Sequence, residues 1–239
     1  QIEVSAGPFD DLESALDCLG GFQAELEQAA GDDIHVLAIG YHPTMRAIDL
    51  SLIPKARYQI MNEYLGAISM YGICMMRGSA ATQVSIDYRS VNDCLRKMRL
   101  ANALVPLLAL MTDNAPLFEA APRPHQMMRT QIWEQCDPDR CGTVPGVMEE
   151  GFTWEAYAEY ILDTPAMVDL STGTPQLSQK TFGDIFADRV MTETDVEHAL
   201  SVFFTDVRLK RYIEIRPADA MAAEYAVAYG ALIKGLFYS

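Results

Sequence analysis

RLKRYIEIRPAD, residues 208–219, is the most informative stretch of the chain. Within it, residues 212–216 alternate polar and apolar side chains, which is the pattern of a half-buried strand. Side chains two positions apart share a face of a strand, so Glu214 and Arg216 point together, away from the two isoleucines. An acid and a base aimed from one rigid strand could hold a metal cation beside a phosphate. The alternative is an ion pair on the surface of a sheet, which contributes little to stability.

Two other segments, residues 1–5 and 79–88, show the same alternation and predict strands with one polar face. Side by side, the three strands would form a polar floor of carboxylates and neutral oxygen ligands. Such hard oxygen ligands suit Mg²⁺, which is bound by one or two carboxylates together with substrate phosphates. The alternative is a face that is simply solvated, as one face of an antiparallel sheet often is. The residues expected on this floor are Gln1, Glu3, Ser5, Gln83, Ser85, Asp87, Tyr212, Glu214 and Arg216.

Helical patterns of apolar residues separate these strands, and another short strand is expected at residues 34–41. Strands and helices do not alternate regularly, and the sequence contains no GxGxxG and no GxxxxGK[ST] motif, which argues against a Rossmann-type sheet. We therefore expect a single α+β domain over residues 1–239, with a mostly antiparallel sheet and helices packed on one side. The expected helices cover residues 12–30 with an interruption at Gly20-Gly21, then 57–71, 90–112 with a kink at Pro106, 154–162, 193–204 and 219 onward.

Composition limits the possible partners of the chain. Its 239 residues include 18 basic and 33 acidic side chains, for a net charge of −15. This balance argues against nucleic acid as a partner, although a few arginines can still bind an anionic substrate locally. No apolar run approaches the ~20 residues of a membrane span, so no membrane partner is expected. The five cysteines are scattered and form no CxxC pair, which indicates free thiols in a reducing cytoplasm.

Two arginines stand out by their surroundings. Arg57 opens a helix after Pro54-Lys55, and Arg129 lies in an apolar segment four residues before Trp133. An arginine on an apolar segment needs a carboxylate, a phosphate or another acidic partner. That partner is either a bound substrate or an acidic side chain of the protein itself.

Segments in order along the chain resemble the plant-type glutamate–cysteine ligases, a family that includes many bacterial enzymes. Their collinear order over nearly the whole chain is more specific than any single motif. The segments, each with the family pattern in parentheses, are QIEVSAGP at 1–8 (QFELSGAP), IGYHP at 39–43 (GFxP), PKARYQIM at 54–61 (PKGRYxIM), MM at 75–76 through TQVSID at 82–87 (MM…xQVNLD), MRTQIW at 128–133 (MRSxIW), DPDRCG at 137–142 (DxDRxG) and VRLKRYIEIRPAD at 207–219 (VRLKRYLEMRGAD).

The resemblance implies a glutamine-synthetase-like catalytic fold, in which the polar side of a curved antiparallel sheet forms the active-site funnel. It implies ATP- and Mg²⁺-dependent ligation of the γ-carboxylate of L-glutamate to the amine of L-cysteine, the first step of glutathione synthesis. ATP would phosphorylate the γ-carboxylate, and the amine would then displace phosphate from the γ-glutamyl phosphate. The protein would position the reactants and neutralise charge. The expected partners are these small molecules, and the oligomeric state is left open.

Four residues match positions that hold the metal and the phosphate in the family. Glu3 and Glu214 match Mg²⁺ ligands, and Gln83 matches a neutral position beside the metals. Arg216 matches the arginine that contacts the transferred phosphate. The family's early strand, with its paired metal-binding glutamates, has no counterpart before Gln1. We therefore expect a fragment that is truncated at both ends and inactive by itself.

Three residues match substrate positions of the family. Arg129 matches the arginine that holds the α-carboxylate of glutamate, Arg57 matches a second substrate-binding arginine, and Tyr58 matches an aromatic residue near the cysteine pocket. Ser85 departs from the usual Asn, and Pro217 replaces the usual Gly. Two alternatives remain open: a related ligase that joins glutamate to another amine, and an inactive homologue that binds glutamate or a protein partner.

Overall fold

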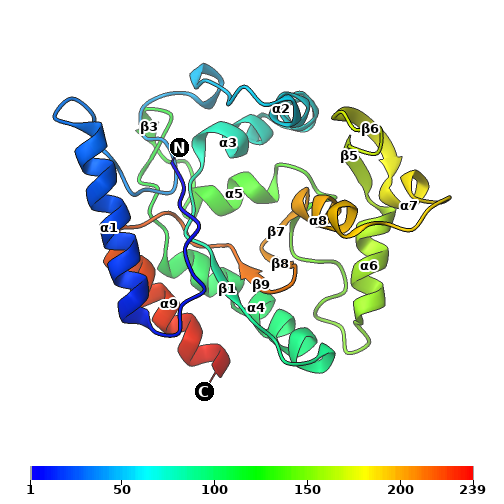
Figure 1. The fold of residues 1–239 in the computed structure, drawn as a ribbon. Helices are drawn as coiled ribbons and strands as arrows, with labels where there is room; N and C mark the ends of the chain where they lie inside the picture. Colours follow the sequence, from blue (N-terminus) through cyan, green and yellow to red (C-terminus); the bar gives the residue numbers. More distant parts are fainter. Residues whose placement is uncertain (1, 239) are drawn as a thin grey trace.

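The computed structural model describes residues 2–238 as a mixture of helices and short strands, which confirms the predicted α+β class (Figure 1). The elements, in chain order, are α1 (Leu12–Ala30), the 3₁₀ helix η1 (Ala47–Asp49), α2 (Ala56–Ile68), α3 (Met70–Gly78), β1 (Val84–Ile86), α4 (Val91–Met111), β2 (Leu117–Phe118), β3 (Ala121–Pro122), α5 (Met128–Glu134), β4 (Cys141–Gly142), α6 (Trp154–Asp163), β5 (Pro165–Asp169), β6 (Gln176–Thr181), α7 (Phe182–Ile185), α8 (Glu193–Ser201), β7 (Phe204–Thr205), β8 (Val207–Leu209), β9 (Ile213–Ile215) and α9 (Ala223–Tyr238).

The central sheet has three strands in the order β1-β9-β8, and both of its pairings are antiparallel. β9 is the middle strand and corresponds to the alternating stretch predicted from the sequence. Its Ile213 and Ile215 are buried in the core, and α4 packs against β8 and β9. The other strands form two-stranded pairs, β2 with β3, β5 with β6 and the parallel pair β4 with β7. The sheet that carries the predicted polar floor is therefore antiparallel but small.

The helices follow the sequence pattern closely at their starts. α4 begins after Ser90, whose side chain accepts a hydrogen bond from the backbone of Asp93, and it continues through Pro106. α6 begins after Thr153, which also caps as predicted. The predicted break at Gly20-Gly21 is wrong, since α1 is continuous across it. The predicted helix over 57–71 is instead two helices, α2 and α3, which are separated by a residue that caps α3.

Two predicted strands are wrong. Residues 2–5 and 34–39 have no regular secondary structure, and Tyr41 forms an isolated bridge with Ser79. Gln1 lies outside the described residues. Alternation determines which side chains share a face, but a strand also needs a neighbouring strand to pair its backbone N–H and C=O groups. Within residues 2–238 these two segments have no such neighbour.

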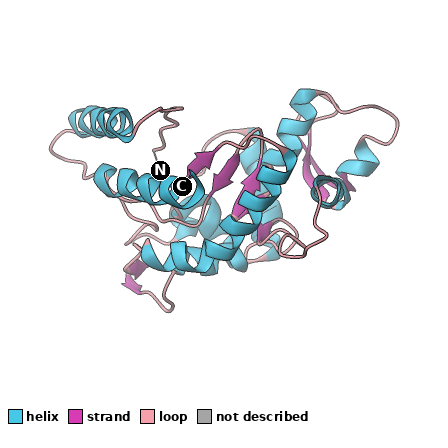
Figure 2. Cartoon of the chain, turned by 90° about the horizontal axis from the view of Figure 1, so that it is seen from below, coloured by secondary structure: helices cyan, strands magenta, loops and turns pink. Residues whose placement is uncertain are grey.

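The β5–β6 hairpin and helices α6 to α8 lie at one end of the molecule, opposite the end that carries α1 (Figures 1 and 2). Arg140 ties this end to α2. Its buried guanidinium lies 2.5 Å from Asp137, donates a hydrogen bond to the hydroxyl of Tyr64 at 3.2 Å, and donates another to the backbone oxygen of Pro165. The DPDRCG motif at residues 137–142 thus connects α2 to β5 through buried polar contacts.

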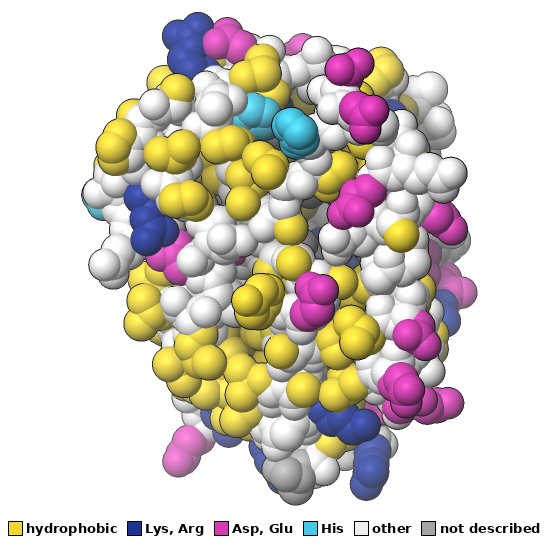
Figure 3. All heavy atoms as spheres, turned by 90° about the vertical axis from the view of Figure 1, so that its left-hand side faces the viewer, with side chains coloured by type: hydrophobic (Ala, Val, Ile, Leu, Met, Phe, Trp, Pro, Cys, Tyr) yellow, Lys and Arg dark blue, Asp and Glu magenta, His cyan; other side chains and the backbone are white. Residues whose placement is uncertain are grey.

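The side of the molecule on the left of Figure 1 carries many apolar side chains on its surface (Figure 3). α1 and α9 pack on each other at this side, and every side chain of α1 keeps some exposure. In the described part of the chain, we find no helix that is both long enough and apolar enough to span a membrane. The large exposed apolar residues of these two helices and of the segments that flank α1 are Ile2, Val4, Phe9, Leu16, Ile34, Val36, Leu37, Tyr225, Leu236 and Tyr238.

Candidate functional site

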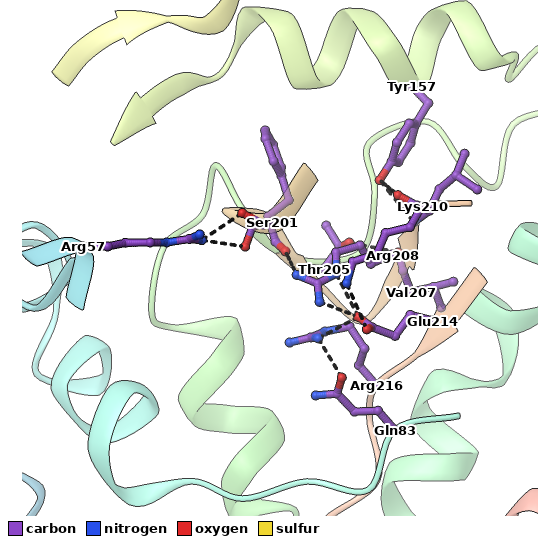
Figure 4. A network of polar contacts seen from close by, with 12 residues as sticks. Arg57, Gln83, Tyr157, Ser201, Thr205, Val207, Arg208, Lys210, Glu214 and Arg216 are labelled. Carbon is purple, nitrogen blue, oxygen red and sulfur yellow. Dashed lines mark hydrogen bonds and ion pairs between the residues drawn. The ribbon is translucent and has the colours of Figure 1, made fainter. Parts of the chain in front are cut away.

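A row of polar side chains crosses the central sheet. Ser85 of β1 and Arg208 of β8 both pair with Glu214 of β9 in the strand register. Residues that face each other on neighbouring strands project from the same side of the sheet. Gln83 extends the row, because its Oε1 accepts a hydrogen bond from Nη1 of Arg216 at 3.1 Å (Figure 4). The structure thus brings together Gln83, Ser85, Glu214 and Arg216 of the predicted polar floor, and β8 takes the place that the sequence assigned to residues 1–5. Asp87 instead contacts Tyr238.

Three cationic side chains surround the carboxylate of Glu214, which is 7% exposed. Its Oε2 lies 2.8 Å from Nε and 2.7 Å from Nη2 of Arg208, and 2.8 Å from Nη1 of Arg216. Its Oε1 lies 3.4 Å from Nζ of Lys210. One oxygen of Glu214 is therefore held tightly by two guanidinium groups, whereas the other makes only a long contact.

This cluster of Arg208, Lys210, Glu214 and Arg216 carries three positive charges and one negative charge. Burial by itself raises the pKa of Glu214, but Arg216 and Arg208 outweigh it and hold the pKa below its ordinary value. The carboxylate is consequently ionised at neutral pH, and the cluster keeps an excess of positive charge. In a partly buried site such an excess favours an anion such as a phosphate.

Arg208 and Arg216 use their guanidinium groups differently. Arg208 is engaged on both sides, because its Nη1 also donates a hydrogen bond to the backbone oxygen of Phe203 at 2.9 Å. Arg216 uses the single nitrogen Nη1 for both Glu214 and Gln83. Among residues 2–238, Nε and Nη2 of Arg216 have no hydrogen-bond partner. Arg216 is thus the arginine of this cluster with donors left for a ligand.

Arg129 contacts the backbone just after β9 and is 4% exposed. Its Nη1 donates hydrogen bonds to the backbone oxygens of Arg216 at 3.1 Å and Pro217 at 3.3 Å. The guanidinium carbons of Arg129 and Arg216 each lie 5.4 Å from the centre of the Trp133 ring, so both arginines pack on one indole. Burial lowers the pKa of Arg129 to about 10, which still leaves it charged at neutral pH.

Arg57 extends from α2 toward the end of α8, where its Nη2 donates hydrogen bonds to Oγ of Ser201 at 2.9 Å and to the backbone oxygen of Ser201 at 3.2 Å (Figure 4). Its Nε is buried and has no partner within the described chain. Tyr58 follows it on α2, is half-buried and packs against the core. Neither residue contacts Glu214 through a hydrogen bond or an ion pair in the part of the chain that the structure describes.

Glu3 is not assembled with the other predicted metal ligands. It is exposed in an irregular segment, and within residues 2–238 no hydrogen bond or ion pair links it to Glu214. The described residues contain no group of three or more His, Cys, Asp or Glu side chains that could hold a metal ion. Oε1 of Glu214 and the amide of Gln83 remain as oxygen donors. They fit an ion that takes most of its ligands from a nucleotide's phosphates and from water.

Two polar residues of β8 and its N-terminal flank were missed by the sequence analysis. Asp206, Arg208 and Lys210 alternate with the apolar Val207 and Leu209 just as residues 212–216 alternate. The same period-two pattern would have predicted a strand with a charged face at this position. Arg208 is the residue that contacts Glu214 most extensively, and Asp206 lies opposite Arg216, as its backbone oxygen accepts a hydrogen bond from Arg216 N at 3.0 Å.

Comparison with known proteins identifies relatives along the entire chain. Residues 1–238 match the family described as Glutamate-cysteine ligase family 2 (GCS2). The chain is 32% identical to the chloroplastic glutamate–cysteine ligase of Brassica juncea, with 100% of the chain and 48% of the relative covered. It is 31% identical to the enzyme of that name from Arabidopsis thaliana, with 100% and 47% covered, and 30% identical to glutamate–cysteine ligase B, chloroplastic, of Oryza sativa subsp. japonica, with 100% and 50% covered. The chain spans about half the length of these curated relatives.

Proposed function

Since the chain belongs to glutamate–cysteine ligase family 2, we propose that the complete protein joins the γ-carboxylate of L-glutamate to the amine of L-cysteine, with ATP as co-substrate. The product would enter glutathione synthesis as its first intermediate. We also propose that the described sheet is part of a glutamine-synthetase-like fold. The free cysteines are consistent with a cytoplasmic location, although the plant relatives are named as chloroplastic enzymes.

The observation that supports this proposal best is the excess of positive charge around Glu214. The chain as a whole carries −15, yet Arg208, Lys210 and Arg216 converge on a single carboxylate. A structural ion pair needs one cation for one anion, and the two additional cations are suited to the phosphates of ATP. Arg216 presents free donors to such a phosphate. Its proposed role is to bind the transferred phosphoryl group and stabilise the charge that develops on its oxygens.

Arg129 would bind the α-carboxylate of L-glutamate through Nε, which has no hydrogen-bond partner within residues 2–238. A bidentate or charge-assisted contact from arginine to carboxylate is both strong and directional. Arg57 would bind a second anionic group of the substrates, since its Nε is also unpartnered and buried in the described structure. Tyr58, the next residue on α2, would form part of the cysteine pocket.

The proposed Mg²⁺ would accompany ATP and reduce the negative charge of its phosphates. Oε1 of Glu214 and the side-chain oxygen of Gln83, which contact Lys210 and Arg216, would hold the ion. Glu3 would join them only after residues 2–9 rearrange, since that segment is now exposed. In the ligation, the protein would orient the two substrates and neutralise the charge of the phosphates.

The proposed reaction has two steps. An oxygen of the γ-carboxylate attacks the terminal phosphorus of ATP, the bond from this phosphorus to the bridging oxygen breaks, and ADP leaves. The amine of cysteine then attacks the γ-carbonyl carbon, the bond from this carbon to the phosphate oxygen breaks, and inorganic phosphate leaves while the nitrogen loses a proton. Arg216 would stabilise the phosphate oxygens in both steps, and Arg129 would keep the γ-carboxylate end in place by holding the α-carboxylate end.

Phosphate release by the complete protein tests this proposal. ATP, MgCl₂ and L-glutamate would be supplied with L-cysteine, L-2-aminobutyrate, glycine or ammonia in turn, and the product identified by mass. We expect the highest kcat/KM with L-cysteine. A preference for another amine would identify a related ligase with a different acceptor. Glutamate binding without phosphate release for any amine would identify an inactive glutamate-binding homologue.

A further inference from the structure

Arg129 and Asp206 contact the same residue from two directions. Nη1 of Arg129 donates a hydrogen bond to the backbone oxygen of Arg216 at 3.1 Å. The backbone nitrogen of Arg216 donates to the backbone oxygen of Asp206 at 3.0 Å. The register of β8 and β9 continues to this point, so Asp206 stands opposite Arg216 and projects from the face that carries Glu214. The basic side chain of Arg129 and the acidic side chain of Asp206 are therefore neighbours around Arg216.

Neither charge is matched by a partner within residues 2–238. Nε of Arg129 is buried and has no hydrogen-bond partner. The half-buried carboxylate of Asp206 accepts no hydrogen bond and forms no ion pair. Burial raises the pKa of Asp206 to about 6, even though Arg129 acts in the opposite direction. Leaving two buried, opposite charges apart is costly unless something that carries both complementary charges joins them.

The nearby Asp219 is committed to a structural contact and does not fill this role. Its Oδ2 accepts a hydrogen bond from the backbone nitrogen of Asn114 at 2.8 Å. The carboxylate of Asp219 also packs closely against the backbone of Gly40. A Cβ atom added to Gly40 would lie 2.2 Å from Oδ2 of Asp219, so Gly40 leaves no room for a ligand on that side. Asp206 is thus the carboxylate near Arg129 that is free for a ligand.

We propose that Asp206 binds the α-ammonium group of the amino-acid substrate whose α-carboxylate is bound by Arg129. A free α-amino acid carries these two charges on one carbon, which matches a basic and an acidic side chain that lie close together without touching. This inference rests on the proposed function, in which the amino acid at Arg129 is L-glutamate. It adds the selection of a free α-amino group, which would exclude N-acylated glutamate and simple dicarboxylates.

Three ligands distinguish the contribution of the α-ammonium group from that of the α-carboxylate. L-Glutamate carries both α-groups, glutarate lacks the α-ammonium, and 4-aminobutyrate lacks the α-carboxylate. Their affinities would be measured by calorimetry on the complete protein with a non-hydrolysable ATP analogue, so no turnover is required. Asp206→Asn should weaken L-glutamate about tenfold to hundredfold, the range of a charge-assisted hydrogen bond, and leave glutarate within about threefold. Arg129→Gln should instead reduce the preference for L-glutamate over 4-aminobutyrate. Asp188→Asn changes an exposed carboxylate and should change none of the three affinities.

The pH dependence of the two affinities provides a second test. Asp206 faces Arg129 and Glu134 of α5 and Arg216 of β9, and its pKa is about 6. The ion pair to the ammonium requires the ionised carboxylate of Asp206, so the wild-type protein should lose its preference for L-glutamate over glutarate as the pH drops from 8 to 5. Glutarate itself is protonated more easily than L-glutamate, so Asp206→Asn serves as the reference, because it retains the titration of the ligands and lacks that of Asp206. Relative to this variant, the ratio of glutarate to L-glutamate dissociation constants of the wild-type protein should fall as the pH drops.

The outcomes distinguish this inference from the proposed function. If Asp206→Asn keeps the wild-type preference for L-glutamate over glutarate, Asp206 does not bind the ammonium and the inference is overturned, while the proposed function stands. A wild-type ratio that changes with pH just as the ratio of Asp206→Asn does would overturn it in the same way. If the wild-type protein binds none of the three ligands but binds the nucleotide, both the assignment of glutamate to Arg129 and the inference fail.

Discussion

Arg208 and Glu214 face each other on β8 and β9, and two nitrogens of the guanidinium group meet one carboxylate oxygen at 2.8 and 2.7 Å. The third nitrogen of Arg208 is bound to the backbone oxygen of Phe203. The arginine is thereby fixed, and it fixes Oε2 of Glu214 in turn. Within residues 2–238, Oε1 of Glu214 makes only a long contact with Lys210, and Nε and Nη2 of Arg216 have no hydrogen-bond partner. Arg208 is best understood as a positioning residue for Glu214.

A double-mutant cycle tests this relationship. Arg208→Lys replaces a planar fork with a single point charge, so Glu214 loses its fixed orientation. We expect kcat of the complete protein to fall at least about tenfold, or ~1.4 kcal/mol in the activation free energy, while the KM for glutamate changes less than about threefold. Glu214→Gln should reduce activity further, and adding Arg208→Lys to it should have little further effect, because positioning residues act through their partner.

The control for this cycle is Arg211→Lys, since Arg211 is exposed and the two carboxylates that pair with it, those of Glu193 and Glu197, are exposed as well. This change should leave kcat as it is. Independent, additive losses from Arg208→Lys and Glu214→Gln would contradict the positioning role. In that case Arg208 would contact the substrate by itself.

Arg129 should determine affinity for glutamate more than affinity for ATP. Arg129→Lys keeps the charge but loses the donors that lie in a plane, so we expect the KM for glutamate to rise about tenfold or more and the KM for ATP to stay within about threefold. Steady-state kinetics with each substrate varied in turn measures both values. Equal increases in the two constants would indicate that Arg129 mainly supports the backbone of Arg216 and Pro217, to which it donates its hydrogen bonds.

The strand that holds Glu214 could be predicted because its pattern is local. Ile213 and Ile215 are buried, and Glu214 projects to the polar side, as the alternation requires. The caps at Ser90 and Thr153 were predictable for the same reason, since a cap depends on a side chain and a backbone N–H only three residues away. These features need no knowledge of distant parts of the chain.

Pairing between distant segments could not be predicted in this way. Residues 2–5 alternate as well as residues 79–88 do, but only the latter contain a paired strand, β1. The third strand of the site is β8, for which no strand was predicted from the sequence. The sequence also predicted a helix over residues 193–204, whereas α8 ends at Ser201 and the chain enters β7 at Phe204. Each outcome depends on tertiary contacts that override local preference.

Asp219 should make the stability of the protein depend on pH near neutrality. Burial raises the pKa of Asp219 to about 6 from its ordinary value of 3.8. The folded protein therefore binds this proton more tightly than the unfolded chain does, and the group destabilises the folded state progressively as the pH rises from about 4 to above 6. Asp219→Asn removes this titration. Relative to the wild type, the variant should gain on the order of 1 kcal/mol in unfolding free energy between pH 5 and pH 7.5.

Urea unfolding at the two pH values measures this difference. Asp188→Asn serves as the control, because Asp188 is exposed and its variant should track the wild type at both values. A relative stability of Asp219→Asn that is the same at pH 5 and pH 7.5 would mean that Asp219 titrates normally in the folded protein.

Removing Arg140 alone should destabilise the protein more than removing the charges of Arg140 and Asp137 together. Both side chains are buried, and their nearest atoms are 2.5 Å apart. Arg140→Met leaves the carboxylate of Asp137 buried without its cation, which typically costs about 3–5 kcal/mol. The double variant Asp137→Asn with Arg140→Met removes the unpaired charge and should recover part of this loss. The recovery should be incomplete, because Arg140 also donates hydrogen bonds to Tyr64 and Pro165. Urea unfolding of the two variants decides the matter: if the double variant is as unstable as Arg140→Met or less stable, the loss comes from those hydrogen bonds and not from the stranded carboxylate.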